Sequence, residues 1–244
     1  MENSLLIGLS RQMTLRREMD VIANNLANMN TIGYKEETPV FEEFIMPTAK
    51  QDSADSTLSF VNDIGMYRNM ADGGLTTTDN ALDFALSGAG YFQVENEDGT
   101  FYTRNGHFQL NAQGQLSTPN GDLVLSDGGA PISFTADDGA IVVASDGTIS
   151  TDNGQRGKLA VVTFENPREM RKIGSNLLQT GEEGQPAKAT AVVQGALEAS
   201  NVNAIEQMTS MIEVLRSYTS ANKMIETAED MKRKAISTIA GQQS

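Results

Sequence analysis

Two patterns contain residue types that could act as a nucleophile or bind phosphate, and each lacks a part that the chemistry needs. Ser220 and Lys223 have the SxxK spacing of a serine nucleophile with a lysine base, but the chain has no SDN or KTG partner and the pair falls in a helical pattern. Gly88 and Gly90 begin a GxGxxG loop, but Gln93 stands at the third position and a strand pattern follows. Neither pattern predicts a catalytic or cofactor-binding site.

Metal and acid–base sites are equally incomplete. Asn96 and Asp98 resemble part of a calcium loop, but its first ligand position would be Val94, which has no side-chain oxygen. The chain has no cysteine and a single histidine, His107, which excludes cysteine-ligated metals and sites with two imidazoles. His107 follows an Asn-Gly turn and is expected to be a surface strand residue. We therefore expect no enzyme activity, cofactor, metal or small-molecule substrate.

The charge distribution limits the partners. A net charge of −14 disfavours nucleic acid and anionic membranes, because both would repel the chain. The whole imbalance lies in residues 36–194, whereas the two ends are nearly neutral, which predicts ends that contact protein and a middle that faces solvent. No apolar run reaches the length of a membrane span, and residues 1–8 lack the basic start and apolar stretch of a signal peptide.

Helical periodicity marks both ends of the chain. Apolar residues recur at steps of three and four from Leu5 to Leu26, and Asn28, Asn30 and Gly33 then favour a helix end. After Gly195 the period returns with a mean step of about 3.4, close to that of a coiled-coil seam. The narrow apolar stripe of this helix needs a partner helix, and the N-terminal helix is the candidate. The positions assigned to the seam are Ile205, Met208, Ile212, Leu215, Tyr218 and Ile225.

The middle of the chain alternates with a period of two. Three dipeptides supply the positive φ that tight hairpin turns require: Asp98-Gly99, Asn105-Gly106 and Asn120-Gly121. We predict an antiparallel β domain over residues 81–190 and a linker or loop over residues 36–80. The fold class is α+β: this central β domain is combined with a discontinuous helical assembly domain, residues 1–35 and 195–244, whose helices pair as in a coiled coil.

Three blocks of the sequence resemble signatures of the flagellar axial proteins, the family of rod, hook and hook-associated proteins. The first block is ANNLANMNTIGYK at residues 23–35. The second comprises LDFAL at residues 82–86, GYF at 90–92 and YTRNG at 102–106, and the third comprises GALE at 195–198 and SNVN at 200–203. The length and the single β domain look like the basal-body rod proteins rather than the longer hook protein.

This resemblance implies a structural subunit of the bacterial flagellar rod. It favours the proximal-rod branch, because residues 36–70 are short, acidic and divergent, and it leaves the distal-rod branch as the alternative. It implies polymerisation through the terminal helices into part of a drive shaft that transmits torque. The implied partners are the chain itself, other proximal- and distal-rod subunits and the flagellar type III export apparatus. The implied location is the periplasm-spanning basal body, reached without a cleaved signal peptide.

The asparagine-rich block provides the candidate assembly residues. Its residues could form a helix end with a left-handed turn at Gly33, or a packing site whose amides bind neighbouring backbones, and the number of asparagines favours both. Two other function classes stay open: a secreted β-rich enzyme acting on polysaccharide, which would need two facing carboxylates, and an adaptor that binds another protein without polymerising. The assembly motif comprises Asn24, Asn25, Leu26, Asn28, Asn30, Thr31, Gly33 and Tyr34.

Overall fold

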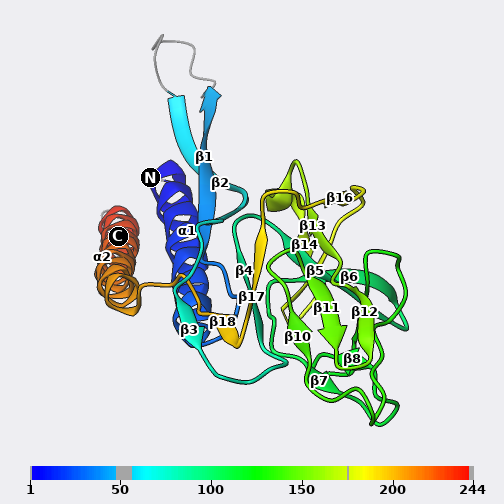
Figure 1. The fold of residues 1–244 in the computed structure, drawn as a ribbon. Helices are drawn as coiled ribbons and strands as arrows, with labels where there is room; N and C mark the ends of the chain where they lie inside the picture. The colour runs from blue at the N-terminus through cyan, green and yellow to red at the C-terminus, as the bar shows by residue number, and fades with distance from the viewer. Residues whose placement is uncertain (1, 48–56, 175, 242–244) are drawn as a thin grey trace. The chain divides into compact units, whose positions relative to one another are not determined.

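The computed structural model describes residues 2–47, 57–174 and 176–241 of the chain. The chain begins and ends with a long helix, and all strands come between the two helices in chain order (Figure 1). Every strand pair within the described ranges is antiparallel. The predicted α+β class is therefore confirmed. In the described part of the chain, neither helix carries an apolar stretch sufficient to cross a membrane.

The chain divides into two compact units. The first, called the helical unit, comprises Met1–Ala27, Glu37–Asn69 and Asn203–Ser244. The second, called the β unit, comprises Asn28–Glu36 and Met70–Val202.

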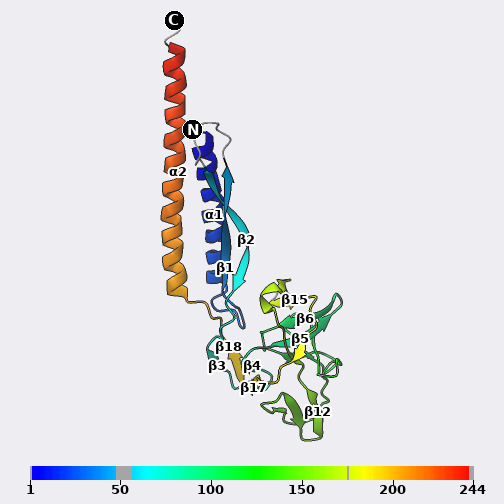
Figure 2. The ribbon, with the colours of Figure 1, turned by 90° about the horizontal axis from the view of Figure 1, so that it is seen from above.

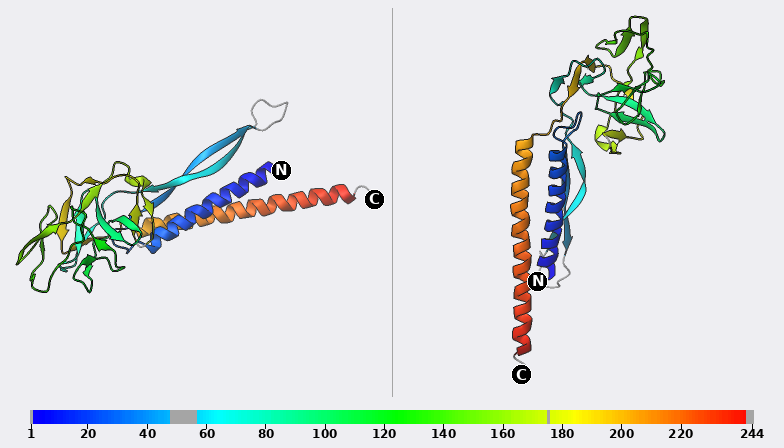
Figure 3. Two further views of the ribbon diagram at one scale, coloured as in Figure 1. Left: turned by 90° about the vertical axis from the view of Figure 1, so that its right-hand side faces the viewer. Right: turned by 90° about the horizontal axis from the view of Figure 1, so that it is seen from below.

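The helical unit contains α1 (Glu2–Ala27), α2 (Ala204–Gly241), β1 (Glu37–Pro47) and β2 (Thr57–Arg68). The helices run antiparallel, since Asn25, near the end of α1, bonds to Gln207, near the start of α2, whereas Gln12, earlier in α1, bonds to Asn222, later in α2 (Figure 2). Because α2 has 38 residues and α1 has 26, α2 continues beyond the first turn of α1 (Figure 3). Both helices were predicted from periodicity, and α1 ends at Ala27, directly before the predicted stop residues.

The predicted linker or loop over residues 36–80 is wrong where β1 and β2 form a long hairpin. Its register runs from Glu37 opposite Arg68 to Pro47 opposite Thr57, with a bulge after Val40. The bulge interrupts the alternation of side chains, and the prolines argue against a central strand, so the strand pattern was obscured. A two-stranded hairpin has only edge strands, which tolerate proline. Of residues 36–80, residues 48–56 lie outside the described part of the chain.

The β unit is built on a nine-stranded sheet with the order β14-β15-β6-β5-β9-β8-β7, in which β13 pairs with both β5 and β16. Smaller sheets pair β17 with β4, β18 with β3, and β11 with β10 and β12. A 3₁₀ helix, η1 (Pro167–Glu169), precedes β14. The strands are β3 (Leu75–Thr77), β4 (Phe84–Ser87), β5 (Tyr91–Asn96), β6 (Gly99–Thr103), β7 (Gln109–Leu110), β8 (Leu116–Ser117), β9 (Leu123–Val124), β10 (Val142–Val143), β11 (Thr148–Thr151), β12 (Gly154–Lys158), β13 (Val161–Thr163), β14 (Arg171–Lys172), β15 (Leu177–Gln179), β16 (Gln185–Pro186), β17 (Ala191–Gln194) and β18 (Ala196–Glu198).

Two of the three predicted glycine turns have the expected backbone. Gly99 has φ of 125° and Gly121 has φ of 99°, which confirms the prediction at both positions. Gly106 does not have positive φ, so the prediction is wrong there. Glycine is required at Gly106 for a different reason, because a Cβ atom would lie 1.7 Å from the Phe84 carbonyl oxygen.

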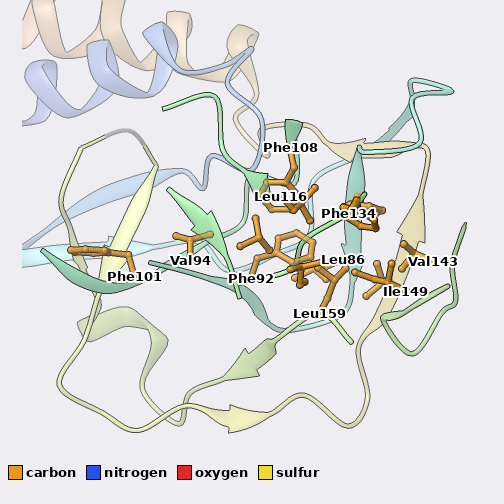
Figure 4. Close-up of a cluster of buried hydrophobic side chains, with 14 of the residues drawn as sticks. Leu86, Phe92, Val94, Phe101, Phe108, Leu116, Phe134, Val143, Ile149 and Leu159 are labelled. Atoms are coloured by element: carbon orange, nitrogen blue, oxygen red, sulfur yellow. The ribbon is translucent and has the colours of Figure 1, made fainter. Parts of the chain in front are cut away.

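The core of the β unit is closed and aromatic-rich (Figure 4). Phe92 and Phe108 meet edge to face with ring centroids 5.3 Å apart, and Leu116 and Ile149 pack in the same cluster. Phe92, Leu116 and Ile149 are fully buried. Such close packing fixes the sheet that positions the segments described below.

Candidate assembly site

The two helices pack through one face of each. Leu15 and Ile22 of α1 form a buried cluster with Val214 and Ala221 of α2, and Met19, Met211 and Tyr218 pack against it. Ile225 also lies on this face, because a Cβ on Gly8 would be 3.0 Å from its Cγ1 atom. The inner face of α2 thus recurs at steps of four and three: Gln207, Met211, Val214, Tyr218, Ala221 and Ile225.

The six residues assigned to the seam do not share one face of α2. Tyr218 and Ile225 belong to the inner face, whereas the other four are exposed. A step of three falls about 60° short of a full turn at 3.6 residues per turn, so the two consecutive steps of three from Ile212 to Tyr218 rotate the stripe by about 120° around the helix. We call the exposed set the outer stripe: Ile205 (79% exposed), Met208 (48%), Ile212 (52%) and Leu215 (50%).

A second apolar surface of the helical unit lies between α1 and the β1–β2 hairpin. It is a groove of about 490 Å³ that begins at Leu6 and reaches Arg17 along α1. Met13 is 66% exposed within it. The lining residues are Leu6, Leu9, Ser10, Met13, Thr14, Arg17, Phe41 and Val61. The groove and the outer stripe are formed by different elements.

The part of the asparagine motif in the helical unit centres on a buried amide. Asn25 Oδ1 accepts from the Glu37 backbone N–H at 3.0 Å, and Asn25 Nδ2 donates to the Glu37 carbonyl at 2.7 Å and to Gln207 Oε1 at 3.3 Å. Asn25 is 1% exposed, so these bonds replace those lost with water. One amide thereby fixes α1 against both β1 and α2. Asn24 is exposed and Leu26 is half-buried.

The part of the motif in the β unit forms a turn. Thr31 donates from its hydroxyl to Asn28 Oδ1 at 3.1 Å and from its N–H to the Asn28 carbonyl at 3.1 Å. Gly33 has φ of 67°, and a Cβ there would lie 2.6 Å from the Arg104 carbonyl carbon, which confirms the left-handed turn. Tyr34 is buried beneath Lys172, whose Nζ lies 4.2 Å from the ring centroid. Asn30 is exposed, and a contact of the motif with a neighbouring subunit stays a prediction.

Sequence reasoning did not identify a buried set of charges in the β unit. Glu198 is 1% exposed, and its carboxylate forms ion pairs with Lys35 Nζ at 2.6 Å and with Arg104 Nε at 2.5 Å. Arg104 also meets Asp72 at 2.9 Å. Lys35, Arg104 and Glu198 come one from each of the three signature blocks. The signal in the sequence that could have predicted this buried set was the position of charged residues beside apolar ones in those blocks.

The patterns first considered for chemistry occupy ordinary structural positions. Ser220 and Lys223 lie exposed on α2, and Asn96 accepts the Asp98 N–H within the β5–β6 turn. His107, whose side chain is 43% exposed, has its Nδ1 atom 2.7 Å from Asp83 Oδ1. Among the described residues, no group of three or more potential ligands is placed to hold a metal ion.

Three family models match successive parts of the chain. They are described as flagella basal body rod protein at residues 5–35, flagellar hook protein FlgE/F/G D1 domain at residues 85–151, and flagellar basal body rod FlgEFG protein C-terminal at residues 193–238. Together they include the N-terminal helix, much of the β unit and most of α2.

Curated relatives match along nearly the whole chain. The flagellar basal-body rod protein FlgF of Caulobacter vibrioides is 39% identical, with 97% of each chain covered, and FlgF of Mesorhizobium japonicum is 30% identical, with 98% of each covered. FlgG of Bacillus subtilis is 32% identical over 97% of this chain and 98% of its own. The chain therefore belongs to the flagellar basal-body rod proteins, as a structural rod subunit most like FlgF.

Proposed function

We propose that this rod subunit polymerises through its terminal helices and forms part of the drive shaft that transmits torque. Its partners would be other copies and other rod subunits, proximal and distal, within the periplasm-spanning basal body. Export by the flagellar type III apparatus without a cleaved signal peptide is part of the same proposal. No catalytic role is proposed, since the relatives reported above are named as rod proteins.

The observation that carries this proposal is the uneven distribution of exposed apolar side chains. Among the large apolar side chains that are exposed in the described residues, 15 belong to the helical unit and four to the β unit. Contiguous exposed apolar surface in a soluble chain is typical of an interaction site. Eight of these 15 residues lie in the outer stripe and the groove.

Burial of this surface against other subunits would favour assembly. Each Å² of apolar surface removed from water contributes about 25 cal/mol, which is offset by the loss of freedom on association. Because the outer stripe and the groove are different surfaces, contact between them would be heterologous. Heterologous contacts that do not close into a ring generate a helical filament, which is the form a rod requires.

The charge of the β unit also supports assembly through the helical unit. The β unit has 18 acidic and eight basic residues, so repulsion disfavours close packing of β units on one another. We therefore propose that residues 1–35 and 195–244 act as the assembly domain, together with the β1–β2 hairpin, and that residues 81–190 face outward.

The test introduces a charge into the outer stripe. Ile212→Asp and Leu215→Asp, each alone, should prevent incorporation into basal bodies, because a buried unpaired carboxylate is costly. Both side chains are about half exposed in the subunit, so the unfolding midpoint of the monomer should change little. The measurements are the amount of the subunit in purified basal bodies and the midpoint of denaturant unfolding.

The matched control is Ser220→Asp, which adds the same charge at an exposed α2 position outside the outer stripe. This variant should assemble as the unmodified chain does. Normal incorporation of Ile212→Asp and Leu215→Asp would contradict assembly through this surface.

A distal-rod role is the second candidate, because FlgG of Bacillus subtilis matches over nearly the whole chain. Strains lacking either FlgF or FlgG distinguish the two roles. Restored motility in the FlgF-deficient strain alone supports the proximal position, and restoration in the FlgG-deficient strain alone supports the distal one.

A further inference from the structure

We propose that Lys35, Asp72, Arg104 and Glu198, here called the charge clamp, hold together the segments through which the chain enters and leaves the β unit. The inference rests on the proposed function, since a shaft that transmits torque must pass force between the two units of each subunit. The chain passes between the units after residues 27, 36, 69 and 202. Three of these four crossings lie within a few residues of a clamp residue.

One carboxylate joins three segments of the chain. Glu198 Oε1 accepts from Lys35 Nζ at 2.6 Å and from the Gly73 N–H at 2.9 Å, and Glu198 Oε2 accepts from Arg104 Nε at 2.5 Å. Lys35 directly precedes the second crossing, Gly73 follows the third, and Glu198 precedes the last. Force applied to any of these crossings therefore reaches the same side chain.

Neighbouring bonds tie the same segments. The Gly33 N–H donates to the Glu198 carbonyl at 2.8 Å, and Lys35 Nζ donates to the Ala71 carbonyl at 2.7 Å. Asn201 donates through Nδ2 to that carbonyl at 3.0 Å and accepts the Glu36 N–H at 2.7 Å. These bonds set the path of each segment, and the ion pairs add attraction between them.

Arg104 fastens the clamp to the sheets. Its Nη1 atom donates to the Gly90 carbonyl at 2.6 Å, directly before β5, and its Nη2 atom donates to the Leu86 carbonyl at 3.3 Å in β4. The clamp contains two cations and two carboxylates and is thus balanced in charge. Because Lys35, Arg104 and Glu198 are buried, salt and water screen their attraction weakly.

The decisive variant replaces the Lys35–Glu198 pair with methionines of similar shape, Lys35→Met together with Glu198→Met. It keeps Arg104 paired with Asp72, so it leaves no uncompensated charge and is expected to fold. Amide exchange at Gly33, Gly73 and Asn201 should become at least about tenfold faster, while Val94 in the core strand β5 is unchanged. Cells carrying it should assemble a normal number of rods and swim normally in dilute medium, but lose about half their speed or more in viscous medium.

A matched control pair is Asp138→Asn with Arg156→Met, which removes another ion pair of the β unit whose residues lie far in sequence from the crossings. It should leave the speed in viscous medium unchanged. The proposal is overturned if the amide-exchange rates of the decisive variant equal those of the unmodified chain. It is also overturned if cells with normal rods that carry this variant swim in viscous medium as fast as cells with the unmodified chain.

A single variant and the choice of sample separate failure of the charge clamp from failure of folding or of assembly. Lys35→Met alone retains the Arg104–Glu198 pair and should give a smaller change in the same direction, which extends the test if the double variant does not fold. Exchange is measured on the soluble monomer. If the unmodified chain builds no rods, the proposed function is contradicted. The amide-exchange rates of the monomer then still decide whether the charge clamp exists.

Discussion

The two units of this chain bury their apolar residues to very different degrees. In the β unit, Phe92, Leu116 and Ile149 are removed from solvent by the unit's own strands. In the helical unit, Leu15 and Val214 are buried between the helices, whereas the residues of the outer stripe are 48–79% exposed. The β unit thus completes its core with its own strands, and the helical unit leaves apolar surface exposed.

This difference separates stability from assembly. A closed core stabilises a single copy, because its contacts do not depend on concentration. In the proposed assembly, the exposed stripe would contribute little to one copy and would stabilise the polymer, by an amount that depends on subunit concentration. Mutations in the two units are therefore expected to affect different measurements.

The largest effect on the isolated subunit is expected from Phe92→Ala. Removal of this buried ring should lower the free energy of unfolding by about 3–5 kcal/mol, from lost burial and the cavity left behind. Ile212→Ala, a truncation in the outer stripe, should change it by less than about 0.5 kcal/mol, because that side chain is half exposed. Denaturant titration measures the free energy of unfolding of both variants. Equal decreases in the two variants would contradict the difference between the closed core and the exposed stripe.

An intermediate effect is expected from Asn25→Ala, which tests whether the helical unit has any fixed interior of its own. The change leaves the Glu37 N–H and carbonyl without their side-chain partners, so the free energy of unfolding should fall by about 1–3 kcal/mol. Asn24→Ala, at the adjacent exposed position, is the control and should have a smaller effect. If the two variants unfold alike in denaturant, the buried amide does not hold α1 against the hairpin.

The smallest effect is expected from the pH dependence of Asp138 in the β unit. Hydrogen bonds from Arg156 and from the Thr135 N–H hold the pKa of Asp138 well below its usual range. This carboxylate therefore contributes its full stability above the unfolded pKa of about 3.9 and loses it as the pH falls through the lower folded value.

Asp138→Asn should accordingly be less stable than the unmodified chain near neutral pH, with a difference that shrinks in acid. Thermal unfolding across this pH range measures it, with Asp137→Asn, at the exposed neighbouring position, as the control. A difference that is constant with pH would show that the ionised carboxylate contributes nothing.

Local periodicity was sufficient for the elements whose pattern is regular. The helices α1 and α2 follow from steps of three and four, and the end of α1 follows from the stop residues after Leu26. The antiparallel strands follow from alternation and from turns such as Asp98-Gly99. The β1–β2 hairpin was missed, because a bulge and prolines hide its alternation. The resemblance of the three blocks indicated the family, but it did not predict that Lys35, Arg104 and Glu198 form a buried set of charges.

The sequence by itself determined that the chain has two apolar helices around an antiparallel β region, because these periods are properties of neighbouring residues. Only the tertiary structure decided which face of α2 is covered, because consecutive steps of three carry the stripe from the outer to the inner side. It also decided that Lys35, Arg104 and Glu198 meet. They are separated by 69 and 94 positions, and side chains so distant in sequence come together only when the whole β unit has folded.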